Sequence, residues 1–117
     1  MINSKNLIAE VKMRFPDFGI INEMDELPTV IFAFLSDELI SAIHSKDRKI
    51  KNEFSELINK MAESDDKVVV SSFSEIVAVL CDNLEKNELE EYMSSLSVNA
   101  QELFSLNIKL WNSQFSK

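Results

Sequence analysis

The scarcity of turn-forming residues constrains the fold of this chain more than any other feature of its sequence. Among 117 residues there are one Gly and two Pro. Tight β-hairpins rely on glycine at positions of positive φ, and a sheet protein of this length would need several such turns. The hydrophobic share of 45% lies within the range of globular domains. We therefore expect helices, collected in a single domain that spans residues 1–117.

Apolar residues recur at helical intervals along the chain, and residues typical of caps and turns separate the periodic segments. Pro16 and Pro28 mark two of the boundaries, because proline suits the first turn of a helix and interrupts its interior. The first predicted helices are one that Ser4 caps and that ends at Phe15, a short one from Pro16 to Met24, and one from Thr29 to about Ser45. Next come one that follows an Asp47 cap and ends at Met61, and one that follows the turn 63–66 and ends at Leu84. The last two are a short helix after an Asn87 cap and a helix after a Ser97 cap.

These helices predict an all-α fold, either an irregular bundle or a short stack of six to seven antiparallel helices. The segment from Val68 to Leu84 has apolar residues on several faces, so we expect it in the middle of the fold. The segment after Asp47 is amphipathic and should lie at the surface. Cys81, the only cysteine, falls in an apolar run and is expected to be a buried free thiol. The helix from Thr29 has a broad apolar stripe of Val30, Ile31, Phe34, Leu35, Leu39 and Ile43.

Acidic side chains outnumber basic ones and are separated from them along the chain. The formal net charge of −8 repels phosphate backbones, so nucleic acid is not expected as a ligand. Residues 17–44 contain no Lys or Arg, and residues 68–108 contain only Lys86. Carboxylates near helix starts also complement the helix dipole, which explains many single acids without any partner. The separation from the basic residues Lys46, Arg48, Lys49 and Lys51 instead indicates an acidic surface for a basic partner.

The sequence contains no arrangement typical of a catalytic, metal or nucleotide site. His44 and Cys81 are far apart in sequence, no carboxylate spacing matches a calcium loop, and no pair of acids is singled out for glycoside hydrolysis. No apolar run approaches the roughly 20 residues of a membrane span, and the start of the chain lacks a signal-peptide core. We therefore expect a cytoplasmic protein that is not an enzyme and binds no cofactor, metal or membrane; the sequence leaves its oligomeric state open.

Within roughly residues 5 to 86, three segments combine a helix boundary or a regular spacing of apolar residues in a way that can be compared with other proteins. They are Arg14-Phe15-Pro16-Asp17-Phe18, Leu27-Pro28-Thr29-Val30-Ile31-Phe32, and Ser72-Phe73-Ser74-Glu75 followed by Leu80-Cys81-Asp82-Asn83-Leu84. In these segments the chain resembles small acidic helical immunity proteins of bacterial polymorphic and contact-dependent growth inhibition toxin systems. The resemblance transfers no catalytic residue. It implies a protein that neutralises a cognate basic toxin domain, a nuclease and first of all a ribonuclease, by covering its active or substrate-binding site.

On this hypothesis the contact surface combines a charged rim with a few apolar anchors, for which we select Phe18, Met24 and Tyr92. We also expect the acids of residues 85–91 to lie beside the turn around Asp25. Two alternatives stay open: a helical adaptor or scaffold that binds a basic protein or peptide, and a small enzyme that uses one of the carboxylates. The predicted partner-binding residues are Asp17, Phe18, Glu23, Met24, Asp25, Glu26, Asp37, Glu38, Glu85, Glu88, Glu90, Glu91 and Tyr92.

Overall fold

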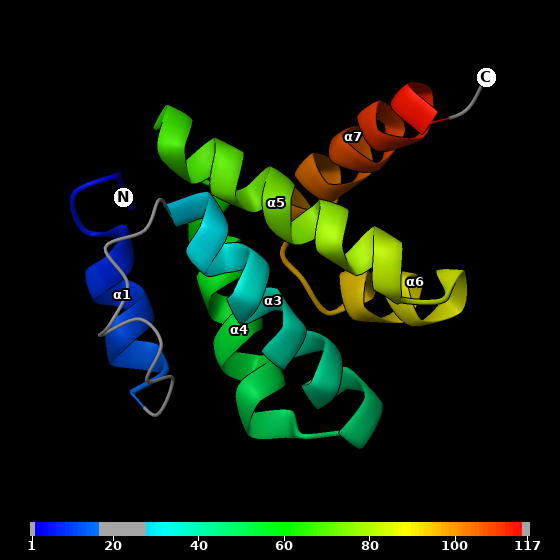
Figure 1. Ribbon diagram of the computed structural model, residues 1–117, viewed down its shortest axis with the longest axis horizontal. Helices are drawn as coiled ribbons and strands as arrows, with labels where there is room; N and C mark the ends of the chain where they lie inside the picture. Colours follow the sequence, from blue (N-terminus) through cyan, green and yellow to red (C-terminus); the bar gives the residue numbers. More distant parts are fainter. Residues whose placement is uncertain (1, 17–27, 116–117) are drawn as a thin grey trace.

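In the computed structural model, residues 2–16 and 28–115 are described, and every regular element within them is an α-helix (Figure 1). The predicted all-α class is therefore confirmed. The short helix predicted between Pro16 and Met24 falls almost entirely outside the described residues. The helices are α1 (Leu7–Arg14), α3 (Pro28–Ser45), α4 (Arg48–Met61), α5 (Lys67–Asn83), α6 (Lys86–Ser94) and α7 (Val98–Phe115).

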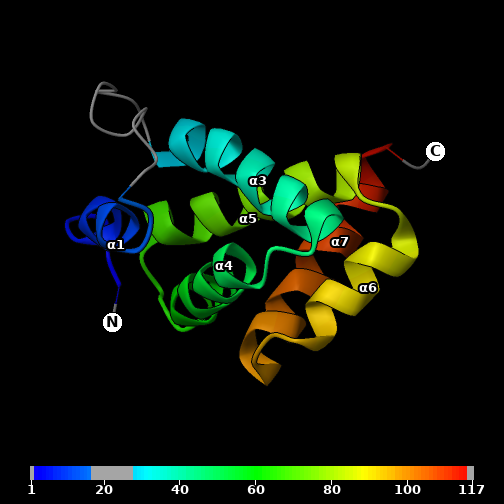
Figure 2. The ribbon, with the colours of Figure 1, turned by 90° about the horizontal axis from the view of Figure 1, so that it is seen from below.

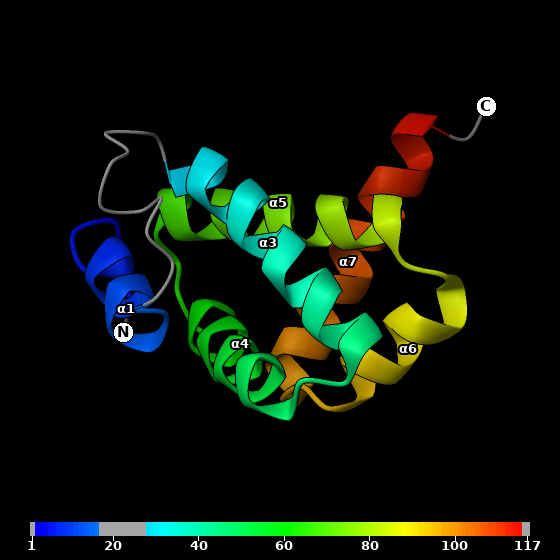
Figure 3. The same ribbon diagram turned by 60° about the horizontal axis from the view of Figure 1, so that its bottom comes forward.

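Helix α5 is the centre of the fold, as its apolar residues predict. It packs most extensively against α3 and then against α7, and it also contacts α4 and α6. Figures 1 and 3 show α3 and α5 crossing each other, while Figure 2 shows α1 and α6 at opposite ends of the molecule. Because α3 and α5 are not consecutive in the chain, the arrangement is the irregular bundle rather than the stack of antiparallel neighbours.

The core is built around four phenylalanines, one from each of the four longest helices. Phe32 of α3, Phe54 of α4, Phe73 of α5 and Phe104 of α7 are all buried. The rings of Phe73 and Phe104 meet edge to face, with centroids 5.4 Å apart and planes at 72°. In this geometry the positive edge of one ring contacts the negative face of the other, which adds to the burial of apolar area. Aromatic packing thus joins α5 to α7 in the interior.

The predicted caps Asp47 and Ser97 are confirmed, and Asp66, the last residue of the predicted turn 63–66, caps α5. The side chains of Asp47 and Asp66 accept hydrogen bonds from backbone N–H groups in the first turns of α4 and α5. The hydroxyl of Ser97 accepts one from the N–H of Ala100 at 3.3 Å, in the first turn of α7. These bonds satisfy N–H groups that have no partner inside the helix, and for this reason Asp and Ser mark helix starts so well.

Two other helix starts differ from the prediction. Helix α1 begins three residues after Ser4, whose backbone N–H instead donates to Oδ2 of Asp66 at 3.1 Å and ties the start of the chain to α5. This bond, followed by those from the first turn of α5, lowers the pKa of Asp66. Helix α6 begins before Asn87, because its N-cap is Glu85, and Oε1 of Glu88 accepts the N–H of Glu85 at 2.9 Å as part of a capping box.

The environment of Cys81 also differs from the prediction. Its thiol is free but only half-buried, in the last turn of α5, and this partial burial raises its pKa. A raised pKa keeps the sulfur protonated at neutral pH, and a protonated thiol is a poor nucleophile.

Candidate functional site

Helix α3 presents acidic side chains and one aromatic ring on its solvent side. Leu35 and Leu39 are buried in the core, whereas Asp37 and Glu38 are exposed and the side chain of Phe34 is 44% exposed. Phe34 precedes the two acids by three and four residues, so the three side chains are neighbours on the helix surface. Within residues 2–16 and 28–115, neither carboxylate forms an ion pair with Lys or Arg. The side chains of Asp37 and Glu38 are therefore available to a basic partner.

The end of α3 meets the first turn of α6 through His44 and Glu88. Nε2 of His44 lies 3.2 Å from Oε2 of Glu88, while the other oxygen of Glu88 caps α6. Asp37 and His44 are seven residues apart and so share one side of α3. The exposed acids of α6 and its cap are Glu85, Glu90 and Glu91. We define the α3–α6 face as Phe34, Asp37, Glu38, His44, Glu85, Glu88, Glu90 and Glu91.

The basic side chains that form ion pairs with carboxylates lie elsewhere, between α1 and α4. Arg14 contacts Glu10 at 3.0 Å, Glu53 at 3.3 Å and Glu56 at 2.7 Å, and Lys60 contacts Glu10 at 3.2 Å. In the part of the chain that the structure describes, every ion pair of a Lys or Arg belongs to this network. Paired charges thus gather near α1, at the end of the molecule opposite α6 (Figure 2).

Replacement of Arg14 should test this network. Its side chain is 9% exposed and meets three carboxylates, so Arg14→Met should lower the free energy of unfolding by about 1–2 kcal/mol at pH 7. Burial raises the pKa of Glu10, but hydrogen bonds from Lys60 and Arg14 outweigh burial and lower it overall. A carboxyl group whose pKa is lower in the folded than in the unfolded protein stabilises the fold at pH values above its unfolded-state pKa. This stabilisation is lost as the pH falls through the lower pKa of the folded state.

The difference between Arg14→Met and the wild type should therefore shrink as the pH falls from 7 to roughly 3. Urea unfolding followed by circular dichroism at both pH values measures it. Lys12→Met, a similar change at an exposed position of the same helix, serves as the control and should have little effect at either pH. An equal loss in the two variants would contradict the role of the network.

The structure places the predicted contact residues as follows. Asp17, Phe18, Glu23, Met24, Asp25 and Glu26 lie outside the described residues, so their contact role and the predicted proximity of Asp25 to residues 85–91 stay predictions. Of the remaining acids, Glu88 is half-buried through its cap and its contact with His44. The exposed acids are Asp37, Glu38, Glu85, Glu90 and Glu91.

Tyr92 is the predicted anchor that the structure contradicts. Its side chain is 2% exposed, and its hydroxyl lies 3.1 Å from Oγ of Ser55 on α4. Burial raises the pKa of this phenol, with the Ser55 hydrogen bond acting in the opposite direction. Tyr92 follows buried Leu89 by three residues and so belongs to the inner stripe of α6. It joins α6 to α4 and is not available to a partner.

Phe34 is the exposed aromatic residue that the sequence analysis missed. Its position in a broad apolar stripe of α3 predicted burial, but it lies at the edge of that stripe, where the neighbouring helices leave 44% of its side chain exposed. Its spacing from Asp37 and Glu38 could have indicated an exposed position, because these acids lie one helical turn from Phe34. An aromatic residue beside unpaired acids is typical of an interface anchor with a charged rim.

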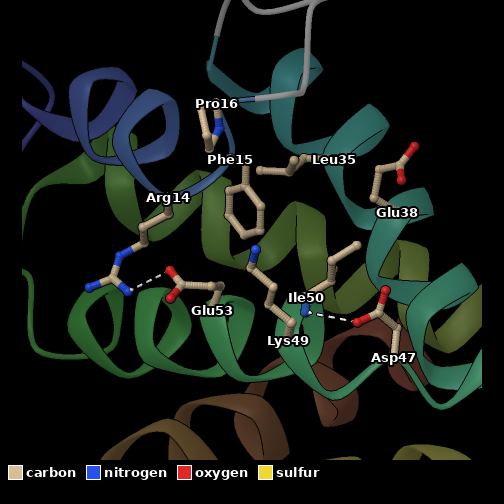
Figure 4. A pocket seen from close by; sticks show the side chains of 9 residues that line it. All are labelled: Arg14, Phe15, Pro16, Leu35, Glu38, Asp47, Lys49, Ile50 and Glu53. Atoms are coloured by element: carbon tan, nitrogen blue, oxygen red, sulfur yellow. Dashed lines mark hydrogen bonds and ion pairs between the residues drawn. The ribbon is translucent and has the colours of Figure 1, made fainter.

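A cavity of about 320 Å³ opens beside Glu38, between the end of α1, α3 and the start of α4 (Figure 4). Phe15, Leu35 and Ile50 supply apolar walls, and the side chain of Lys49 extends from α4 among them. Other lining residues are Arg14 and Pro16, with the carboxylates of Asp47, which caps α4, and Glu53, which binds Arg14. The volume is at the small end for ligand sites. The cavity fits one long side chain of a partner better than a whole substrate.

Comparisons with known proteins do not assign this chain to a family. No family model, curated protein or solved structure matches it. Among the described residues, no group of three or more His, Cys, Asp or Glu side chains is placed to hold a metal ion. None of the helices in residues 2–16 and 28–115 combines the length and apolar character needed to cross a membrane. The case for a function rests on the α3–α6 face.

Proposed function

We propose that this protein is an immunity protein that binds a basic toxin domain through the α3–α6 face and blocks its active or substrate-binding site. The observation that carries the proposal is the exposed ring of Phe34 beside the unpaired acids Asp37 and Glu38, with the acids of α6 following beyond His44. A nuclease has a basic cleft for phosphate groups, and exposed carboxylates match the charge of those phosphates. Ribonuclease is the toxin activity that we favour.

The two kinds of side chain on this face have different roles in binding. Carboxylates attract a basic protein over a distance and raise the association rate by one or more orders of magnitude in low salt. An aromatic side chain surrounded by a charged rim is the usual source of most of the affinity, because its burial excludes water and slows dissociation. Phe34 is therefore the expected anchor, and the acids around it set the rate and the orientation of encounter.

The decisive experiment is co-expression with a neighbouring toxin candidate. A gene beside this one that encodes a large protein with a variable carboxyl-terminal domain supplies that candidate. Expression of the terminal domain should arrest growth, and co-expression of this protein should relieve the arrest. Continued arrest, or the lack of a complex between the purified proteins in calorimetry, would count against neutralisation.

Phe34→Ala should weaken the complex about 30-fold, which corresponds to roughly 2 kcal/mol for a hot-spot aromatic. The stability of the free protein should change by less than about 1 kcal/mol, because 44% of the side chain is exposed. Calorimetry with the inactive toxin domain and thermal unfolding measure the two effects. Met13→Ala, at a residue that is 67% exposed on α1, is the matched control and should leave the affinity unchanged.

A helical adaptor that binds a basic peptide is the second candidate, and the cavity beside Glu38 favours it. Leu35 and Ile50 would cover the methylene stem of a lysine or arginine, while Glu38 would meet its charge. Lys49→Trp should fill the cavity and abolish peptide binding, while Lys49→Met controls for the lost charge. Neutralisation of a toxin through Phe34 should survive both changes.

A further inference from the structure

Helix α7 carries exposed leucines that the α3–α6 face does not include. Leu106 is 53% exposed and Leu110 is 55% exposed, whereas Ala100 and Phe104 of the same helix are fully buried. Figures 1 and 3 show α7 passing α5 and running out toward the C-terminus. The outer side of α7 therefore carries exposed leucines among its charged and polar residues.

The side chains around Leu106 form a hole of the kind used when helices pack together. Glu102, Ser105, Leu106 and Lys109, together with Gln101, border an open depression on the protein surface. The first four stand at positions i, i+3, i+4 and i+7, the set of four residues that receives one side chain of a facing helix in knobs-into-holes packing. The depression is thus shaped for a side chain from a second helix.

We infer that α7 pairs with α7 of a second copy of this protein, antiparallel and about a two-fold axis, with Leu106 of each copy in the hole of the other. The order of charges points to a second copy as the occupant. Glu102 stands at the amino end of the hole and Lys109 at its carboxyl end, with Leu106 close to their midpoint. A two-fold axis at this midpoint brings Glu102 of each copy opposite Lys109 of the other. Parallel pairing would instead place like charges opposite one another.

The charge at this place also favours self-association. The protein has a net charge of −8, so most of its surface repels a second copy. The hole carries one acid and one base and adds no net charge, unlike the acidic α3–α6 face. In this register Leu110, one turn beyond Leu106, lies opposite the uncharged Gln101 of the other copy. The outer side of α7 is therefore where two copies can approach with little electrostatic cost.

Analytical ultracentrifugation over a range from about 1 µM to 1 mM tests the inference, because two leucines and two exposed ion pairs support only weak affinity. The wild type should pass from monomer to dimer within this range. Leu106→Glu should stay monomeric throughout, with unchanged thermal stability. Met13→Glu, a similar change at an exposed position of α1, should dimerise as the wild type does. A wild type that stays monomeric, or a dimer that Leu106→Glu does not weaken, would overturn the inference.

A charge exchange tests the antiparallel register. Glu102→Lys and Lys109→Glu should each weaken dimerisation about tenfold in low salt, since each places two pairs of like charges across the interface. The double variant Glu102→Lys/Lys109→Glu should recover wild-type affinity, and an equimolar mixture of the two single variants should form the heterodimer. A double variant that stays as weak as the single ones would overturn the two-fold arrangement.

Discussion

Replacement of Asp37 and Glu38 by lysine is expected to slow association with a basic toxin domain by one to two orders of magnitude in low salt. Both side chains are exposed on α3, and neither pairs with a Lys or Arg among the described residues. Their reversal therefore changes the potential of the α3–α6 face without removing a contact of the fold. Glu88 is left unchanged, because it caps α6 and binds His44. Stopped-flow fluorescence with the inactive toxin domain measures the rate.

The matched control is Glu63→Lys/Asp65→Lys, which makes the same change in net charge in the exposed turn between α4 and α5. That turn adjoins Asp66, which binds the start of the chain near α1, and so it lies away from α6. The control should slow association only slightly. Equal effects of the two double variants would show that net charge, and not the α3–α6 face, governs the encounter.

A test without the toxin uses hexaamminecobalt(III) as a trivalent cationic probe. Titration of the isotope-labelled protein should shift the backbone amide signals of α3 and α6 more than those of α1 and α4, because the cation collects where carboxylates lack counter-charges. Shifts spread evenly over the four helices would remove the electrostatic basis of the proposed contact.

Truncation of Phe73 should have the largest effect on stability, a loss of about 3–5 kcal/mol in the free energy of unfolding. The residue is 1% exposed on the central helix and packs edge to face on Phe104. Phe73→Ala would leave a cavity where α5 meets α7 and would also remove the aromatic contact. Since small domains have only about 5–15 kcal/mol in total, the variant should unfold at much lower urea concentration.

Val70→Ala is the control on the same helix, one turn earlier, where the side chain is 38% exposed. It should cost less than about 1 kcal/mol. A double-mutant cycle with Phe104→Ala then isolates the ring–ring contribution, expected at about 0.5–1.5 kcal/mol. A loss below about 1 kcal/mol for Phe73→Ala would contradict the central position of α5.

The sequence predicted those parts of the fold that depend on local chemistry. Asp47, Asp66 and Ser97 mark helix starts because their side chains bind N–H groups two or three residues away, and this is readable without knowing the fold. The start of α6 was misplaced at Asn87, because a capping box between Glu85 and Glu88 caps the helix two residues earlier.

Periodicity predicts burial for both Phe34 and Tyr92, and it is right for Tyr92 but wrong for Phe34. Each lies on an apolar stripe, and periodicity defines the direction of a stripe but not how far a neighbouring helix covers its edges. Phe34 is 44% exposed on α3, while Tyr92 lies on the inner side of α6 with its hydroxyl 3.1 Å from Oγ of Ser55 on α4. The anchors at Phe18 and Met24 lie outside the described residues and stay predictions.

The ion pairs of Arg14 near α1 and the acids of α6 lie toward opposite ends of the molecule. The longest dimension is 39 Å, and α1 and α6 lie toward its two ends. At physiological ionic strength, dissolved ions screen charges over about 8 Å. The two ends of the molecule are therefore several screening lengths apart. A cation that approaches the acids of α6 therefore experiences little of the positive charge of Arg14.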